Sequence, residues 1–210
     1  MPGLAATPSL SYSALHDPLA LPDFCDFDSK NERTKTREIP AGTISPASAL
    51  SLVILSSLLF VLTAFSINKL CFYLSPVALA VVLGYSLTKR FTFLCHLILG
   101  IGLSLAPIGA YLAVTGRFDW VPLFFSFAVI CWVSGFDIIY ALQDDEFDRS
   151  LQLYSIPAYF GRKNALQFSN LLHAMAVVFI VLAGINFHFS WIYWTGASIF
   201  TGLIIYQHTL

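Results

Sequence analysis

The sequence contains few charged side chains. Asp, Glu, Lys and Arg make up 11% of its 210 residues, whereas 57% of the residues are hydrophobic. A soluble domain typically carries about 25% charged residues. The stretch 164–210 contains none of these four residue types. Because so little charge cannot cover a water-facing surface, we expect an integral membrane protein embedded in a lipid bilayer.

Other scarcities exclude further classes. The net charge of −1 gives no electrostatic reason to expect a nucleic-acid partner. The four cysteines contain no CxxC pair, so we expect free thiols and neither a disulfide framework nor a zinc site. The first 46 residues lack both a membrane-spanning run and the apolar core of a signal peptide. Residues 1–25 are expected to be disordered.

Long apolar runs fill the rest of the chain. A spanning helix needs about 20 apolar residues, and a lone segment in lipid must satisfy its own backbone hydrogen bonds. The sequence therefore predicts an all-α fold, a polytopic transmembrane helix bundle with about six spans and a last turn at Asn186–His188. The predicted spans are 47–67, 70–88, 92–115, 120–142, 164–185 and 189–207.

Lysine and arginine predict the orientation of these spans. Loops on the side where the first span begins carry nine of them, and loops on the opposite side carry two, Lys69 and Arg117. By the positive-inside rule the nine-residue side is cytoplasmic. This places the approach to the first span, the turn YSLTKR and the acidic stretch after the fourth span at one aqueous entrance. The nine are Lys30, Arg33, Lys35, Arg37, Lys89, Arg90, Arg149, Arg162 and Lys163.

The acidic stretch suggests a metal. Asp137 lies in an apolar run, and the string DDEFD extends from Asp144 to Asp148. On a continuous helix the three aspartates 137, 144 and 148 would share one stripe, where a cation would offset their repulsion. Mg²⁺ takes one or two carboxylates and completes its shell with water and phosphate oxygens. The alternatives are a solvated acidic loop, and an Asp137 that pairs with a tyrosine or a backbone group to hold helices together.

Cations gather on the same side. Lys89, Arg90 and Arg149 suit phosphate oxygens, although positive-inside anchoring also explains them. The acids and cations would lie together at the cytoplasmic end of a helix bundle that is rich in Phe and Leu. Such a site would suit a substrate with a diphosphate head and a long apolar tail. The apolar interior could shield a carbocation from water.

Three separated segments resemble the UbiA family of membrane prenyltransferases. The sequence GFDIIYALQDDEFD, followed by SIPAYFG, resembles the second aspartate-rich motif of its 4-hydroxybenzoate polyprenyltransferase-like branch. The segment DSKNERTKTREIPAGTIS resembles the loop after the first motif. The segment that begins YSLTKRFTFLCH resembles the next stretch, with its Tyr…Lys-Arg signature. The similarity covers about Asp28 to the C-terminus, in the family's order.

The resemblance implies an enzyme of ubiquinone or menaquinone biosynthesis in a bacterial inner membrane, with its motif loops in the cytoplasm. Such enzymes transfer a polyprenyl group from polyprenyl diphosphate to an aromatic acid such as 4-hydroxybenzoate, with Mg²⁺. The implied metal ligands are Asp28, Asp144 and Asp148. The implied catalytic residues are Asp144, Asp148, Lys89 and Tyr140. The implied substrate-binding residues are Asp137, Tyr85, Arg90, Arg37, Asn31 and Arg149.

The sequence departs from the family pattern in three ways. The first three positions of the first aspartate-rich motif hold Ala20, Leu21 and Phe24. Family members have nine spans, so residues 26–210 are expected to form a transmembrane domain without the first two and the last. Gln152 stands where the family usually has glycine. We therefore expect the chain to catalyse prenyl transfer weakly or not at all. The alternatives to a prenyltransferase are an inactive fragment of that enzyme or an ion-coupled transporter.

The scattered histidines are expected to be packed or interfacial residues. They are His96, His173, His188 and His208.

Overall fold

The computed structural model describes residues 38–39, 41–150 and 152–209, and this part of the chain is helical without strands. The predicted all-α class is therefore confirmed. The chain divides into two compact units, 1–58 and 59–210, at a point inside α2. The helices are α2 (Pro46–Ile67), α3 (Lys69–Gly84), the 3-10 helix η2 (Tyr85–Arg90), α4 (Cys95–Thr115), α5 (Val121–Ala141), α6 (Asp145–Ser150), α7 (Ile156–Phe160), α8 (Arg162–Asn186) and α9 (Trp191–Gln207).

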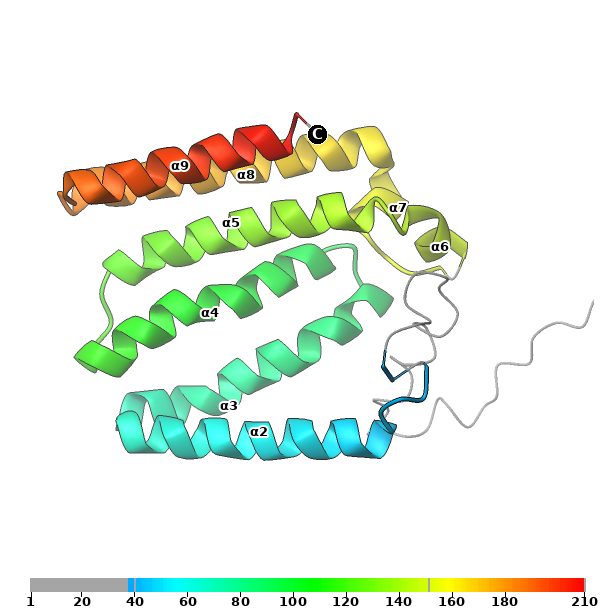
Figure 1. The fold of residues 1–210 in the computed structure, drawn as a ribbon, viewed down its shortest axis with the longest axis horizontal. Coiled ribbons are helices and arrows are strands. Elements are labelled where there is room, and N and C mark those ends of the chain that lie inside the picture. The colour runs from blue at the N-terminus through cyan, green and yellow to red at the C-terminus, as the bar shows by residue number, and fades with distance from the viewer. Residues whose placement is uncertain (1–37, 40, 151, 210) are drawn as a thin grey trace, which may run out of the picture. The chain divides into compact units, whose positions relative to one another are not determined.

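In the second unit, α5 lies between α4 and α8, while α3 packs on α4 and α9 packs on α8 (Figure 1). Small residues occupy many of the buried positions of the three central helices, which lets their backbones approach closely. These positions include Gly100, Gly102 and Ser104 on α4, Ser126, Ala128, Ser134 and Gly135 on α5, and Ala165, Ser169 and Ala176 on α8.

Large apolar side chains lie on the outside of this unit. Val114 is 88% exposed and Leu203 is 62% exposed, whereas Ser134 and Ser169 are fully buried. An apolar exterior around small and polar contacts is stable in lipid, where there is no hydrophobic penalty for exposing leucine. Four helices, α2, α4, α5 and α8, are long and apolar enough to cross a membrane. The chain is an integral membrane protein, as its composition predicts.

Most helix boundaries agree with the sequence-based spans. The second span is shorter than expected, because α3 ends at Gly84 and residues Tyr85–Arg90 wind into η2. With 16 residues, α3 is about 24 Å long, less than the roughly 30 Å of a bilayer core. The predicted last turn is confirmed: α8 ends at Asn186, and His188 adopts the positive φ of 50° before α9 begins.

The thiol prediction is confirmed wherever the structure describes a cysteine. Cys71, Cys95 and Cys131 are free. Cys25 lies outside the described residues, as does the whole segment 1–25 that was expected to be disordered.

Candidate functional site

One end of the second unit gathers segments that are far apart in sequence. The end of α5, the short helices α6 and α7, and the start of α8 lie near the start of α4, which follows η2 (Figure 1). Ring contacts hold this arrangement: Phe93, just before α4, stacks on Tyr159 of α7 with centroids 5.1 Å apart and meets Phe160 edge-on at 5.4 Å. The turn YSLTKR and the acidic stretch therefore lie at the same end of the bundle, as the orientation argument predicts.

His96 is at the centre of this end. It lies in the first turn of α4 and is 2% exposed. Its Nδ1 is 2.7 Å from Oδ2 of Asp137 in α5, and its Nε2 is 3.3 Å from the backbone nitrogen of Ile156 at the start of α7. A backbone N–H can only donate, so Nε2 accepts, and the imidazole proton sits on Nδ1 and is donated to Asp137.

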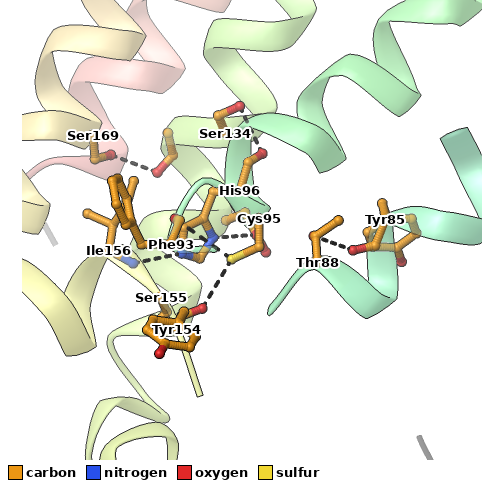
Figure 2. A network of polar contacts seen from close by, with 12 residues as sticks. Tyr85, Thr88, Phe93, Cys95, His96, Ser134, Tyr154, Ser155, Ile156 and Ser169 are labelled. Carbon is orange, nitrogen blue, oxygen red and sulfur yellow. Dashed lines mark hydrogen bonds and ion pairs between the residues drawn. The ribbon is translucent and has the colours of Figure 1, made fainter. Parts of the chain in front are cut away.

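Neighbouring contacts reinforce this junction (Figure 2). The hydroxyl of Ser134 in α5 donates to the carbonyl oxygen of His96 at 3.0 Å. The Cys95 thiol points to the carbonyl oxygen of Tyr154, 3.6 Å away. Ser155, which is fully buried, caps α7 by accepting the backbone N–H of Ala158 at 3.3 Å. Helices α4 and α5 and the segment 154–156 thus form one hydrogen-bonded unit.

The acids of the segment GFDIIYALQDDEFD do not share one helix. Asp137 belongs to α5, which ends at Ala141, and α6 begins at Asp145. The single stripe that a continuous helix would give to residues 137, 144 and 148 is therefore wrong, because the chain turns between α5 and α6. Asp144 and Asp148 remain one turn apart, since the backbone nitrogen of Asp148 donates to the carbonyl oxygen of Asp144 at 2.8 Å.

Asp148 is the more enclosed of these two acids. Its side chain is fully buried, whereas Asp144 is half-buried. A charged residue is almost never fully buried without a compensating interaction. This burial contradicts the solvated-loop alternative for Asp148.

Arg149 of α6 contacts residues of α6 and α7. Its Nη2 donates to the carbonyl oxygen of Pro157 at 3.2 Å and lies 4.0 Å from Oδ2 of Asp145. The side chain is 52% exposed. Because guanidinium has five N–H donors, these contacts leave others for a phosphate.

The other expected site residues lie around this end or outside the described chain. Tyr85 begins η2, where its carbonyl oxygen accepts the Thr88 hydroxyl at 2.5 Å. The backbone of Lys89 and Arg90 ends η2. Tyr140 lies one turn from Asp137 on α5 and is 49% exposed. Three expected residues are outside the described residues: Asp28, Asn31 and Arg37.

The side chains at this end can be tested as ligands for the Mg²⁺ that the sequence predicts. In the described part of the chain, no group of three or more His, Cys, Asp and Glu side chains is placed to hold a metal ion. Mg²⁺ needs fewer, because one or two carboxylates suffice when water and substrate phosphate complete its shell. Asp144 and Asp148, one helical turn apart, supply two hard oxygen donors. In number and kind, though not by any observed metal, these two donors are compatible with an Mg²⁺ whose shell a diphosphate completes.

Gln152 shows why glycine is usual at its position. Its φ is +56°, in the left-handed region that only glycine adopts without strain. The turn follows α6: the backbone nitrogen of Gln152 donates to Arg149 at 3.2 Å, and that of Leu153 donates to Asp148 at 2.8 Å. The chain therefore keeps the turn that glycine favours although it carries glutamine.

His96 is the residue that sequence reasoning missed. The expectation of a packed histidine is met by its burial but overlooks its hydrogen bonds to Asp137 and Ile156. A signal was present, since an aspartate inside a span requires a polar partner. Asp137 does hold helices together, but through a histidine and not through a tyrosine or a backbone group.

Comparisons with known proteins identify this arrangement. The sequence model of the UbiA prenyltransferase family matches residues 25–210. The chain belongs to this family. A solved apo structure of a UbiA homolog from Aeropyrum pernix K1 superimposes with a TM-score of 0.82 at 34% identity, over 86% of this chain and 69% of that one. The resemblance stated from the motifs is confirmed, and the helical arrangement is the UbiA membrane fold.

Curated UbiA relatives are similar over most of the chain. A 4-hydroxybenzoate octaprenyltransferase from Alcanivorax borkumensis is 34% identical over 191 residues, which cover 90% of this chain and 65% of the relative. The enzyme of the same name from Francisella tularensis subsp. novicida is 30% identical over 174 residues, or 83% of this chain and 61% of the relative. The chain thus spans slightly less than two thirds of each of these relatives.

Proposed function

We propose that residues 26–210 form a transmembrane prenyltransferase domain that transfers a polyprenyl group from polyprenyl diphosphate to an aromatic acid such as 4-hydroxybenzoate. The observation that carries this proposal is the fully buried Asp148, which lies one turn from Asp144 at the end of an apolar helix bundle. The names of the relatives support the substrate classes. The motif loops would face the cytoplasm, as the distribution of cations predicts.

The residues of this end have distinct roles in the proposed reaction. Asp144 and Asp148, with Asp28, would hold Mg²⁺, which supplies positive charge that stabilises the leaving diphosphate. Cationic side chains would bind the diphosphate oxygens and orient the reacting carbon toward the acceptor. Asp137 and Tyr140 would line the acceptor side. The cations are Lys89, Arg90, Arg37 and Arg149, and the remaining substrate-binding residues are Tyr85 and Asn31.

The proposed chemistry is electrophilic aromatic substitution. The allylic C–O bond breaks, and diphosphate leaves with the electron pair. The ring carbon beside the hydroxyl group forms a C–C bond to the prenyl carbon and then loses its proton. The apolar surroundings of the bundle would exclude water, which would otherwise capture the cation.

Two carboxylate variants test this proposal. The purified chain in liposomes is mixed with polyprenyl diphosphate and 4-hydroxybenzoate, with Mg²⁺ or with EDTA, and prenylated product is measured by mass spectrometry. Binding of an unreactive prenyl thiodiphosphate is measured in parallel, because weak turnover is expected. Asp144→Asn and Asp148→Asn should each lower magnesium-dependent turnover by about 100-fold or more, the usual effect of losing a group that stabilises developing charge.

Glu146→Gln is the matched control. Glu146 is an exposed acid of the same helix, α6, so its removal changes the local charge equally and should leave turnover and binding unchanged. Magnesium-dependent binding without product would indicate an inactive fragment. Ion flux across the vesicle membrane without diphosphate release would instead indicate a transporter and overturn the proposal.

A further inference from the structure

His96 connects the acidic end of the bundle to its transmembrane frame. Its Nδ1–H donates to Asp137 at 2.7 Å, and its Nε2 accepts the N–H of Ile156 at 3.3 Å. Because only 2% of the surface of His96 is exposed, water has little access to the imidazole and cannot replace these two partners. One side chain therefore fixes both an intramembrane carboxylate and the start of α7.

The main chain around His96 is fixed as well. The Ser134 hydroxyl donates to the carbonyl oxygen of His96 at 3.0 Å, which ties the first turn of α4 to α5. The Cys95 thiol lies 3.6 Å from the carbonyl oxygen of Tyr154. Two consecutive residues of α4 thus contact residues 154 and 156, so α4 is attached to this segment on both sides of Ser155.

The contact at Ile156 extends to the acids through a short connection. The backbone nitrogen of Leu153 donates to the carbonyl oxygen of Asp148 at 2.8 Å. Ser155 caps α7 and is fully buried. Leu153, Ser155 and the His96–Ile156 hydrogen bond therefore link Asp148 to α4.

We propose that His96 is a positioning residue of the prenyl-transfer site: it holds Asp137 in α5 and the start of α7 in one fixed relation, and thereby places Asp144 and Asp148 for the Mg²⁺-bound diphosphate. This inference rests on the proposed function. Sites of this kind tolerate displacements of about 0.5 Å, and an error of 1 Å can cost about 100-fold in rate. A histidine that merely joined α4 to α5 would contribute to stability without affecting diphosphate binding.

Two amide variants separate the two hydrogen bonds of His96. In His96→Gln the side-chain oxygen reaches the place of Nε2 and can still accept the N–H of Ile156. In His96→Asn the shorter amide reaches only the place of Nδ1 and can donate to Asp137. His96→Leu removes both hydrogen bonds.

His173→Leu is the matched control. His173 is also a buried histidine that joins two helices, because its Nε2–H donates to the carbonyl oxygen of Trp132 at 3.2 Å and its Nδ1 is 2.6 Å from Nε2 of His208. Both of these hydrogen bonds lie outside the segment 152–158. The loss of His173 should lower the melting temperature without affecting the acidic loop.

The experiment measures three quantities for each variant in detergent: the melting temperature, the hydrogen–deuterium exchange of the amides of residues 152–158, and the magnesium-dependent binding of a prenyl thiodiphosphate. We expect His96→Asn and His96→Leu to lose amide protection and to bind the diphosphate about 10- to 100-fold more weakly. His96→Gln should retain most of the amide protection and most of the diphosphate affinity, because it can still accept the N–H of Ile156. His173→Leu should differ from wild type in melting temperature alone.

Two results would overturn the proposal. One is unchanged exchange of residues 152–158 in His96→Asn and His96→Leu. The other is weaker diphosphate binding that follows the melting temperature equally in the His96 and His173 variants. If the wild-type chain binds no prenyl diphosphate, the proposed function fails, and the proposed placement of Asp144 and Asp148 for Mg²⁺-bound diphosphate fails with it. The hydrogen–deuterium exchange measurement still shows whether His96 holds residues 152–158.

Discussion

Gly135 of α5 lies directly against the imidazole ring of His173 in α8. A Cβ added at Gly135 would come within 2.7 Å of both Cδ2 and Nε2 of that ring, and within 3.2 Å of the carbonyl oxygen of Ser169. No real Cβ approaches so closely, and the ring is held by its hydrogen bonds to Trp132 and His208. The absence of a side chain at residue 135 therefore sets the distance between α5 and α8.

Gly135→Ala should lower the free energy of unfolding by about 1–3 kcal/mol, the usual cost of overpacking a close contact. Thermal or denaturant unfolding in detergent would measure the change. Gly109→Ala in α4 is the control, because a Cβ there meets nothing within 4 Å. Alanine favours helix, so this control should be neutral or slightly stabilising. Equal effects of the two substitutions would contradict the steric explanation.

Ser169→Ala should destabilise the contact between α5 and α8. The Ser169 hydroxyl is fully buried and donates to the carbonyl oxygen of Gly135 at 2.7 Å. Interhelical hydrogen bonds of membrane proteins contribute about 0.6 kcal/mol on average and at most about 1.7 kcal/mol. The free energy of unfolding should fall by an amount in this range.

Ser198→Ala provides the comparison for Ser169. Ser198 is exposed, and its hydroxyl donates to Trp194 within the same helix at 2.8 Å. Its removal breaks no contact between helices, so the unfolding free energy should stay within about 0.5 kcal/mol of wild type, as for most surface substitutions. A larger loss at Ser198 than at Ser169 would refute the ranking.

Gln152→Gly should stabilise the protein. The φ of +56° costs a residue with a Cβ about 1–2 kcal/mol, and glycine removes this strain. The greater freedom of glycine in the unfolded chain costs about 0.5–1 kcal/mol, so we expect a net gain of about 0–1.5 kcal/mol. Gln167→Gly, at an exposed position inside α8, should have the opposite sign. Destabilisation by both variants would show that residue 152 is unstrained.

Asp119, in the loop between α4 and α5, should make stability depend on pH. The Tyr111 hydroxyl donates to its Oδ2 at 2.8 Å and the backbone N–H of Trp120 donates to its Oδ1 at 2.6 Å. The Tyr111 hydrogen bond is the main cause that lowers the pKa of Asp119, and Arg117 lowers this pKa further. A lowered pKa means that the carboxylate stabilises the fold at pH values above about 3.9, its pKa in the unfolded chain.

The melting temperature should therefore differ between wild type and Asp119→Asn by a constant amount from pH 7 to about pH 5. The difference should shrink as the pH falls below about 4 and through the lowered pKa of Asp119. Tyr111→Phe removes the main cause of the lowered pKa of Asp119, so in that background the difference in melting temperature should shrink by less, and the shrinkage should be complete at a higher pH. A difference that persists unchanged at pH 2 would show that the carboxylate charge is not responsible.

The sequence alone determined the class of this protein and the position of its helices. A bilayer requires about 20 apolar residues per span and satisfied backbone groups. Runs such as 120–142 therefore had to become helices, and Val121–Ala141 did so. The motif around Asp144 and Asp148 also identified the family, because it is local and keeps its spacing whatever surrounds it.

Only the tertiary structure decided which polar groups meet. His96 and Asp137 are 41 positions apart, and Ile156 is 60 positions from His96. No periodicity within one helix encodes such contacts, because they depend on how α4, α5 and α7 pack. The same holds for the break between α5 and α6, which separates Asp137 from the other acids. Local hydrophobicity specifies where a membrane helix forms, but the partner of a buried charge is chosen by packing between helices.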